Sequence, residues 1–187
     1  MSTTLIFAEL LIIGLQATVW LALAVVATSG LRWADLAAVS IGSGWQPVIL
    51  AVALAFVYSI GILVDRIADL VFWPWDRSLK AKYIPESPDP VLVLRAEIGD
   101  ENKALSEHLQ YTRSRMRIVR ASALNFALIT LLACVVVRPL EAPRWAALIV
   151  FFGSGLVAAS VYAWTNLTKT YLLMVKASYL RRGRPVS

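Results

Sequence analysis

The sequence predicts an all-α membrane protein with four transmembrane helices, and three observations support this. First, 59% of the 187 residues are hydrophobic and only 16% are charged, whereas soluble domains have about 45–50% apolar and about 25% charged residues. Second, the apolar excess lies in four runs, each near the roughly 20 residues that a helix needs to cross a bilayer. Third, lipid cannot satisfy backbone polar groups, so such runs form helices. The runs are 5–27, 48–64, 121–137 and 146–165.

The first run is expected to be a retained helix rather than a cleaved signal peptide. No basic residue precedes it, and it is longer than the apolar core of about 7–15 residues found in signal peptides. Cys134 lies in the third run and is the one cysteine. It is expected to be a small packing residue, because a single thiol makes neither a disulfide framework nor a multi-cysteine zinc site.

The basic residues predict the orientation in the membrane. Fifteen of the 18 Lys and Arg residues flank one side of the four runs, and Arg32, Arg138 and Arg144 flank the other. Cytoplasmic flanks carry the Lys/Arg excess, and tryptophans such as Trp73 and Trp75 mark an interface. We therefore expect a bacterial-type inner (plasma) membrane protein with both termini in the cytoplasm.

Three segments follow from this orientation. Residues 1–75 hold transmembrane helices 1 and 2, residues 76–119 form a cytoplasmic linker and helix, and residues 120–187 hold helices 3 and 4 with a basic tail. Prolines at 74, 85, 88 and 90 predict an irregular linker from Pro74 to Pro90. A helix is then expected to begin near Asn102, or as early as Val91, and to continue into the third span.

The cytoplasmic extension is expected to depend on neighbours. It is too short for a core of its own, so it should pack on the inner helix ends, on copies of itself or on another protein. Residues 91–98 fit either a helix or a short strand, because short apolar runs are ambiguous.

A polar cluster is predicted at the cytoplasmic interface. Because successive helices alternate in direction, eight polar residues should reach the same depth there. They are Glu9, Asp65, Arg66, Asp69, Arg120, Asn125, Asn166 and Lys169. Ionisable groups in membrane helices are costly and usually paired, so Glu9 should meet Arg66, Arg120 or Lys169. The cluster is either a salt-bridged helix end or a functional polar vestibule for an ion, a lipid headgroup or a signalling ligand.

Enzymatic chemistry is a weaker expectation. Asp65 and Asp69 could hold a hard cation that carries a phosphorylated substrate. However, His108 is the one histidine, and no phosphate-binding glycine loop or serine nucleophile setting is present. No catalytic residue, metal site or cofactor is therefore assigned.

A basic run precedes the third span. Arg113, Arg115 and Arg117 are expected to meet anionic lipids, at roughly 1 kcal/mol per charge. Their guanidinium groups would also suit a phosphorylated ligand or a nucleic acid.

Small residues at four-residue spacing predict close helix packing, within the chain or between subunits. They are Gly14 and Thr18, then Ala51, Ala55 and Ser59, and finally Gly155 and Ala159.

The sequence thus favours a non-enzymatic, oligomeric membrane protein controlled through its cytoplasmic helix. A channel-like or membrane-disrupting effector, as used in bacterial anti-phage defence, is one form. Its basic run would receive the trigger, and Glu9, Asp65, Arg66 and Asp69 would hold the closed state. The alternatives are a scaffold or accessory subunit of a larger membrane complex, and a metal-dependent phospholipid-modifying enzyme that uses Asp65 and Asp69.

Overall fold

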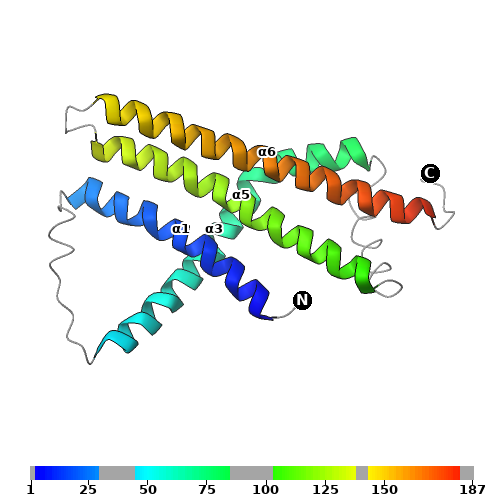
Figure 1. Cartoon of the computed structure of the whole chain (residues 1–187), viewed down its shortest axis with the longest axis horizontal. Coiled ribbons are helices and arrows are strands. Elements are labelled where there is room, and N and C mark those ends of the chain that lie inside the picture. The colour runs from blue at the N-terminus through cyan, green and yellow to red at the C-terminus, as the bar shows by residue number, and fades with distance from the viewer. Residues whose placement is uncertain (1–2, 30–44, 85–102, 138–142, 182–187) are drawn as a thin grey trace.

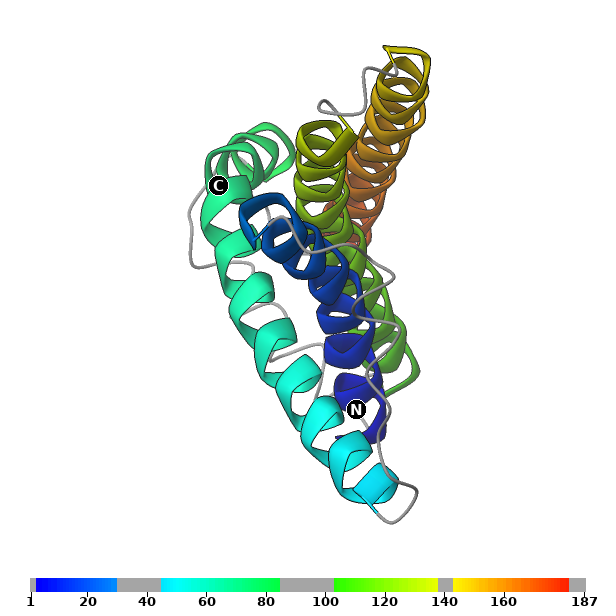
Figure 2. The same ribbon diagram turned by 90° about the vertical axis from the view of Figure 1, so that its left-hand side faces the viewer.

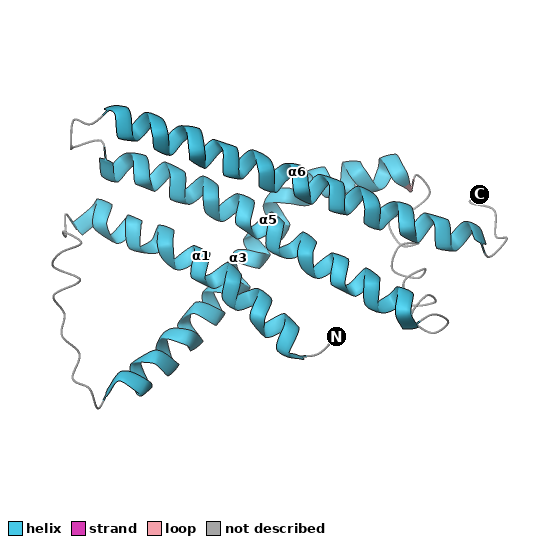
Figure 3. Cartoon of the chain, in the orientation of Figure 1, coloured by secondary structure: helices cyan, strands magenta, loops and turns pink. Residues whose placement is uncertain are grey.

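The computed structural model of the chain describes residues 3–29, 45–84, 103–137 and 143–181. These residues form four helices, which are α1 (Thr3–Ser29), α3 (Gln46–Tyr83), α5 (Lys103–Val137) and α6 (Pro143–Arg181). Within the described residues no strand is present (Figure 3). Each helix contains a stretch long and apolar enough to cross a membrane. The prediction of an all-helical, multi-pass membrane protein is confirmed at this level.

The helices form an open layer rather than a closed bundle. In Figure 1, α1 lies between α5 and the first half of α3, and α5 lies between α1 and α6. Figure 2 shows α1 lying beside the first part of α3, with which it is in contact. The start of α1 and the end of α6 point toward the same end of the molecule as the end of α3. We call this the basic end, because the helix ends that point to it carry most of the lysines and arginines among the described residues.

The helix that begins in the basic segment continues into the third apolar run, as predicted. α5 extends without a break from Lys103 to Val137. The residues 91–98, for which helix and strand were both open, lie outside the described residues.

The predicted linker is wrong in its first part, because α3 continues through Pro74 to Tyr83. A proline inside a helix removes one hydrogen bond and crowds the preceding turn, which is why the sequence suggests a break. Here the helix changes direction instead (Figure 1), the usual effect of an internal proline. Its last turns are held by packing of Leu79 and Tyr83 on other helices, and Lys80 forms an outer ion pair with Asp76 at 2.5 Å.

The ends of three helices share a core at the basic end. Residues 79–84 at the end of α3, 105–116 of α5 and 171–175 of α6 pack together, and we call them the three-helix module. Its buried side chains are Ile84, Leu109, Tyr171, Leu172 and Val175. The extension was expected to pack on the inner helix ends, on copies of itself or on another protein. In the structure it packs on the helix ends of its own chain.

Two glycines allow α1 and α3 to approach closely. A Cβ added to Gly14 would collide with the carbonyl oxygen of Val57, and one added to Gly61 would collide with that of Leu10. The sequence predicted Gly14 but not Gly61. Of the remaining predicted small residues, Thr18 is half-buried. The others are exposed in this chain: Ala51, Ala55, Ser59, Gly155 and Ala159.

Candidate functional site

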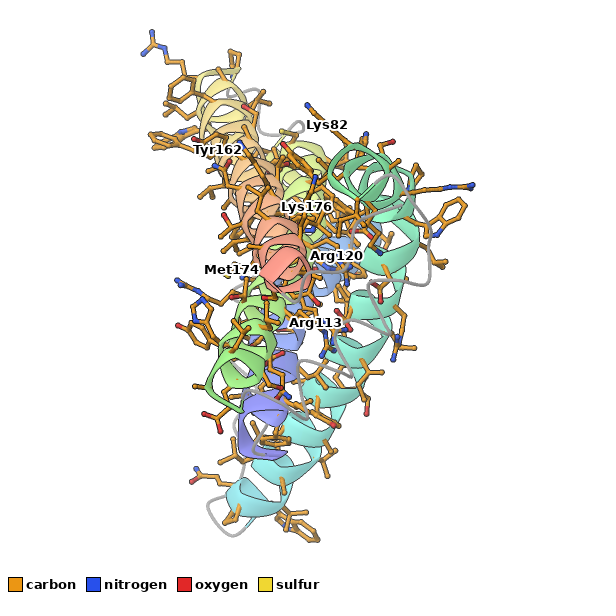
Figure 4. All side chains as sticks on the ribbon, turned by 90° about the vertical axis from the view of Figure 1, so that its right-hand side faces the viewer. Lys82, Arg113, Arg120, Tyr162, Met174 and Lys176 are labelled. Atoms are coloured by element: carbon orange, nitrogen blue, oxygen red, sulfur yellow. The ribbon has the colours of Figure 1, made fainter. Side chains whose placement is uncertain are left out.

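Five charged side chains from three helices meet near the middle of the molecule. We call them the ion-pair cluster: Glu9 of α1, Asp65 and Asp69 of α3, and Arg117 and Arg120 of α5. Each helix presents its members on one face, because residues three or four apart are neighbours on a helix surface. Seen from the basic end, Arg120 lies among the helices (Figure 4).

Asp65 is the centre of the cluster. Its residue is only 3% exposed, and Arg117 donates from Nη2 to Oδ2 at 2.7 Å and from Nε to Oδ1 at 3.5 Å. Arg120 donates from Nη2 to Oδ1 at 3.4 Å. Two-point contact between a guanidinium and a carboxylate is the strong geometry for such pairs. Asp65 is therefore held by α5 through two arginines.

Asp69 connects the cluster to the surface. Nη1 of Arg120 lies 2.5 Å from Oδ1 of Asp69, and Nη1 of Arg66 lies 3.7 Å from Oδ2. The Arg66 side chain is 74% exposed. Arg66 thus lies beside the ion-pair cluster, at the protein surface. It does not reach Glu9, for which the sequence made it one of three candidate partners.

Glu9 has a different cation from those predicted. Ser114 donates its hydroxyl to Oε1, and Nη1 of Arg117 lies 3.8 Å from Oε2. Arg117 therefore takes the place expected for Arg66, Arg120 or Lys169, because its face of α5 points at both α1 and α3. Oε2 of Glu9 and Nε of Arg120 are buried without a hydrogen-bond partner among the described residues. Such groups are costly to bury.

Asn125 belongs to a second polar network, one layer deeper between α1 and α5. Its Nδ2 donates to the Ile13 carbonyl at 3.2 Å and to Oε1 of Gln16 at 3.3 Å. Trp20 donates from Nε1 to Oδ1 of Asn125 at 3.0 Å, and Ser122 donates to Gln16 at 2.9 Å. The sequence prediction missed Gln16 and Trp20. Their spacing from Glu9, two and three helical turns on, was the signal for them.

Other predicted residues lie elsewhere. Asn166 and Lys169 are exposed on α6 and do not belong to the ion-pair cluster. Arg115 is exposed, with its guanidinium 5.4 Å from the centre of the Tyr111 ring. Arg113 is half-buried. Because Arg117 turns inward, the three arginines predicted for a lipid or phosphate ligand do not share one surface.

The chemistry of the cluster is that of a clamp. Each carboxylate faces at least one arginine, so the group ties α1, α3 and α5 together at one level. Among the described residues, no group of three or more His, Cys, Asp or Glu side chains could hold a metal ion.

Comparison of the chain with protein-family models, with curated proteins and with solved structures found no match.

Proposed function

We propose that this chain is a non-enzymatic, homo-oligomeric protein of a bacterial-type inner membrane, with both termini in the cytoplasm. It acts as a channel-like or membrane-disrupting effector, of the kind used in anti-phage defence. A signal received by the three-helix module is carried along α5 to the membrane part. The ion-pair cluster holds the closed state.

One observation carries the proposal: the single helix α5 runs through the three-helix module, the ion-pair cluster and the membrane part. α5 contributes Leu109 to the module, Arg117 to the ion-pair cluster and its last turns to the membrane-spanning region. Its 35 residues correspond to about 50 Å of uninterrupted helix. A shift of α5 against the end of α3 within the module would therefore displace Arg117 relative to Asp65 on α3.

The edges of the helix layer support an oligomer. α6 and the first half of α3 are the outer helices (Figure 1), and both carry exposed small residues, among them Ala55 and Gly155. Small residues on a lipid-facing surface allow helices of neighbouring chains to approach closely. The same edges favour the second candidate, an accessory subunit that binds a different membrane protein.

The pairing of the aspartates favours a non-enzymatic role over the phospholipid-modifying enzyme. Asp65 faces two arginines and Asp69 faces Arg120 at 2.5 Å. A divalent cation between these carboxylates would have to displace both guanidinium groups. The arrangement suits a clamp better than a substrate site.

Release of a trapped dye from liposomes that contain the purified protein tests the effector. We expect low release with the wild type and higher release with Asp65→Asn, because this change frees Arg117 and Arg120 from their central partner. The matched control is Asp76→Asn, which removes an outer carboxylate paired with Lys80. Equal release from all three folded proteins would contradict the proposal. Stable co-purification of a second protein in place of a ring of identical chains would favour the accessory subunit.

A further inference from the structure

The outward face of α3 carries a line of basic and apolar side chains beyond the ion-pair cluster. Its members are Arg66, Leu70, Trp73, Arg77 and Lys80, which we call the α3 stripe. Successive members are three or four residues apart, so they lie one above another on one side of the helix. The stripe follows directly after the apolar run of residues 48–64.

The α3 stripe points away from the rest of the chain. Val64, Ala68 and Phe72 on the opposite side of α3 are buried in the core. In contrast, Leu70 is 75% and Trp73 is 59% exposed. Together they form an exposed apolar surface that an apolar neighbour from outside the chain could cover.

The positive charges of the stripe are incompletely neutralised. Asp69 lies 3.7 Å from Arg66 but 2.5 Å from Arg120, so its carboxylate is engaged mainly inside the cluster. None of the ion pairs among the described residues uses Arg77, whose guanidinium lies 5.6 Å from the centre of the Trp73 ring. Arg66 and Arg77 therefore present their charge outward.

The stripe lies where a bilayer would place its headgroups. α3 leaves its apolar run just before Arg66, tryptophan favours the membrane interface, and arginine extends its charged head from an apolar surface into the polar layer. We propose that the α3 stripe binds anionic phospholipids. Arg66 and Arg77 donate to the lipid phosphates, and Leu70 and Trp73 contact the adjoining glycerol and acyl region.

This proposal is independent of any effector activity and moves the lipid contact to a different helix. The sequence suggested Arg113, Arg115 and Arg117 of α5, but Arg117 is occupied by Asp65. On α3 the charges and the aromatic ring share one exposed face, which is the arrangement that a bilayer surface requires.

Native mass spectrometry of the detergent-solubilised full chain tests the site, with phosphatidylglycerol and phosphatidylcholine added in equal amounts. We expect the wild type to prefer phosphatidylglycerol. The double variant Arg66→Gln/Arg77→Gln should bind it roughly fivefold more weakly for each arginine removed, the equivalent of about 1 kcal/mol per charge. Binding of phosphatidylcholine should not change.

Four comparisons make the result specific. Arg144→Gln, at the opposite end of the molecule, and Arg115→Gln, on α5, should both retain the wild-type preference. Arg66→Lys/Arg77→Lys keeps the charge and should retain most of the binding, which separates loss of charge from loss of fold. Excess inorganic phosphate should not displace the lipid.

Three outcomes would overturn the site. They are equal binding of both lipids by the wild type, an unchanged preference in the glutamine double variant, and loss of the preference in Arg115→Gln. Displacement by inorganic phosphate would show a site for free phosphate in its place.

Discussion

Arg117 of α5 holds the carboxylate of Asp65 on α3 through two of its nitrogens, at 2.7 and 3.5 Å. The same guanidinium lies 3.8 Å from Glu9 of α1. One side chain thus connects three helices that are far apart in the sequence. Because Arg117 also lies on the helix that enters the three-helix module, its contacts connect the ion-pair cluster to that module.

Replacement of Asp65 by asparagine should destabilise the protein strongly. The variant removes the central anion of Arg117 and Arg120, which keep Glu9 and Asp69, and groups that lose a buried hydrogen-bond partner cost about 1–3 kcal/mol. We expect a lower thermal unfolding midpoint in detergent. Asp76→Asn is the control, and it should change the midpoint little because exposed pairs contribute about 0–1 kcal/mol.

The specific coupling of the pair can be measured with a double-mutant cycle. Arg117→Gln alone should also lower the midpoint, and the double variant with Asp65→Asn should lose less stability than the two single losses combined. Additive losses would show that Asp65 and Arg117 do not stabilise each other, contrary to their geometry.

Asn125→Ala should destabilise the contact between α1 and α5. The change removes the acceptor of Trp20 and a donor to Gln16, and a buried polar group left unpaired costs about 1–3 kcal/mol. Asn166→Ala is the matched control, because Asn166 is exposed on α6. Thermal unfolding of the two variants should differ clearly, and equal midpoints would show that the Asn125 network contributes nothing to stability.

The four helices are predictable from sequence because each long apolar run has one main structural solution in lipid. The course of α3 past Pro74 is not. Local chemistry favours a break at that proline. In the structure, residues on both sides of Pro74 pack on other helices. Phe72 packs against Trp164, at 5.0 Å between ring centres, and Tyr83 packs in the module. These contacts join residues distant in the sequence, so no local pattern predicts them.

The candidate site, too, was predictable from the sequence only in part. The meeting of Glu9 with aspartates of α3 and arginines of α5 follows from helix direction and depth, which can be estimated by counting residues. Which arginine meets Glu9 depends on the rotation of α5 about its axis. That rotation is set by contacts such as Ala121 in the core and Ser114 against Glu9. The depth of a residue in the membrane can therefore be predicted from its own helix alone. The neighbouring helix that its side chain faces cannot.

The crossing of α1 and α3 should not tolerate a side chain at its centre. In Gly14→Ala the new methyl group meets the backbone of Val57, which cannot move without displacing the helix, and overpacking typically costs about 1–3 kcal/mol. Gly155→Ala is the control in monomeric, detergent-solubilised protein, since within the single chain a Cβ there meets nothing within 4 Å. We expect a lower unfolding midpoint for Gly14→Ala and no loss for Gly155→Ala. A normal midpoint for Gly14→Ala would contradict the close approach of the two helices.

Two neighbouring leucines test whether the three-helix module is a true core. Leu172 is 1% exposed and Leu173 is 44% exposed, so the same substitution at adjacent positions should have different effects. Leu172→Ala leaves a cavity among Leu109, Tyr171 and Val175 and should cost about 2–5 kcal/mol. Leu173→Ala should cost much less. Limited proteolysis and thermal unfolding of the full-length variants measure this directly, and equal sensitivity of the two would show that the ends of α3, α5 and α6 do not pack as a unit.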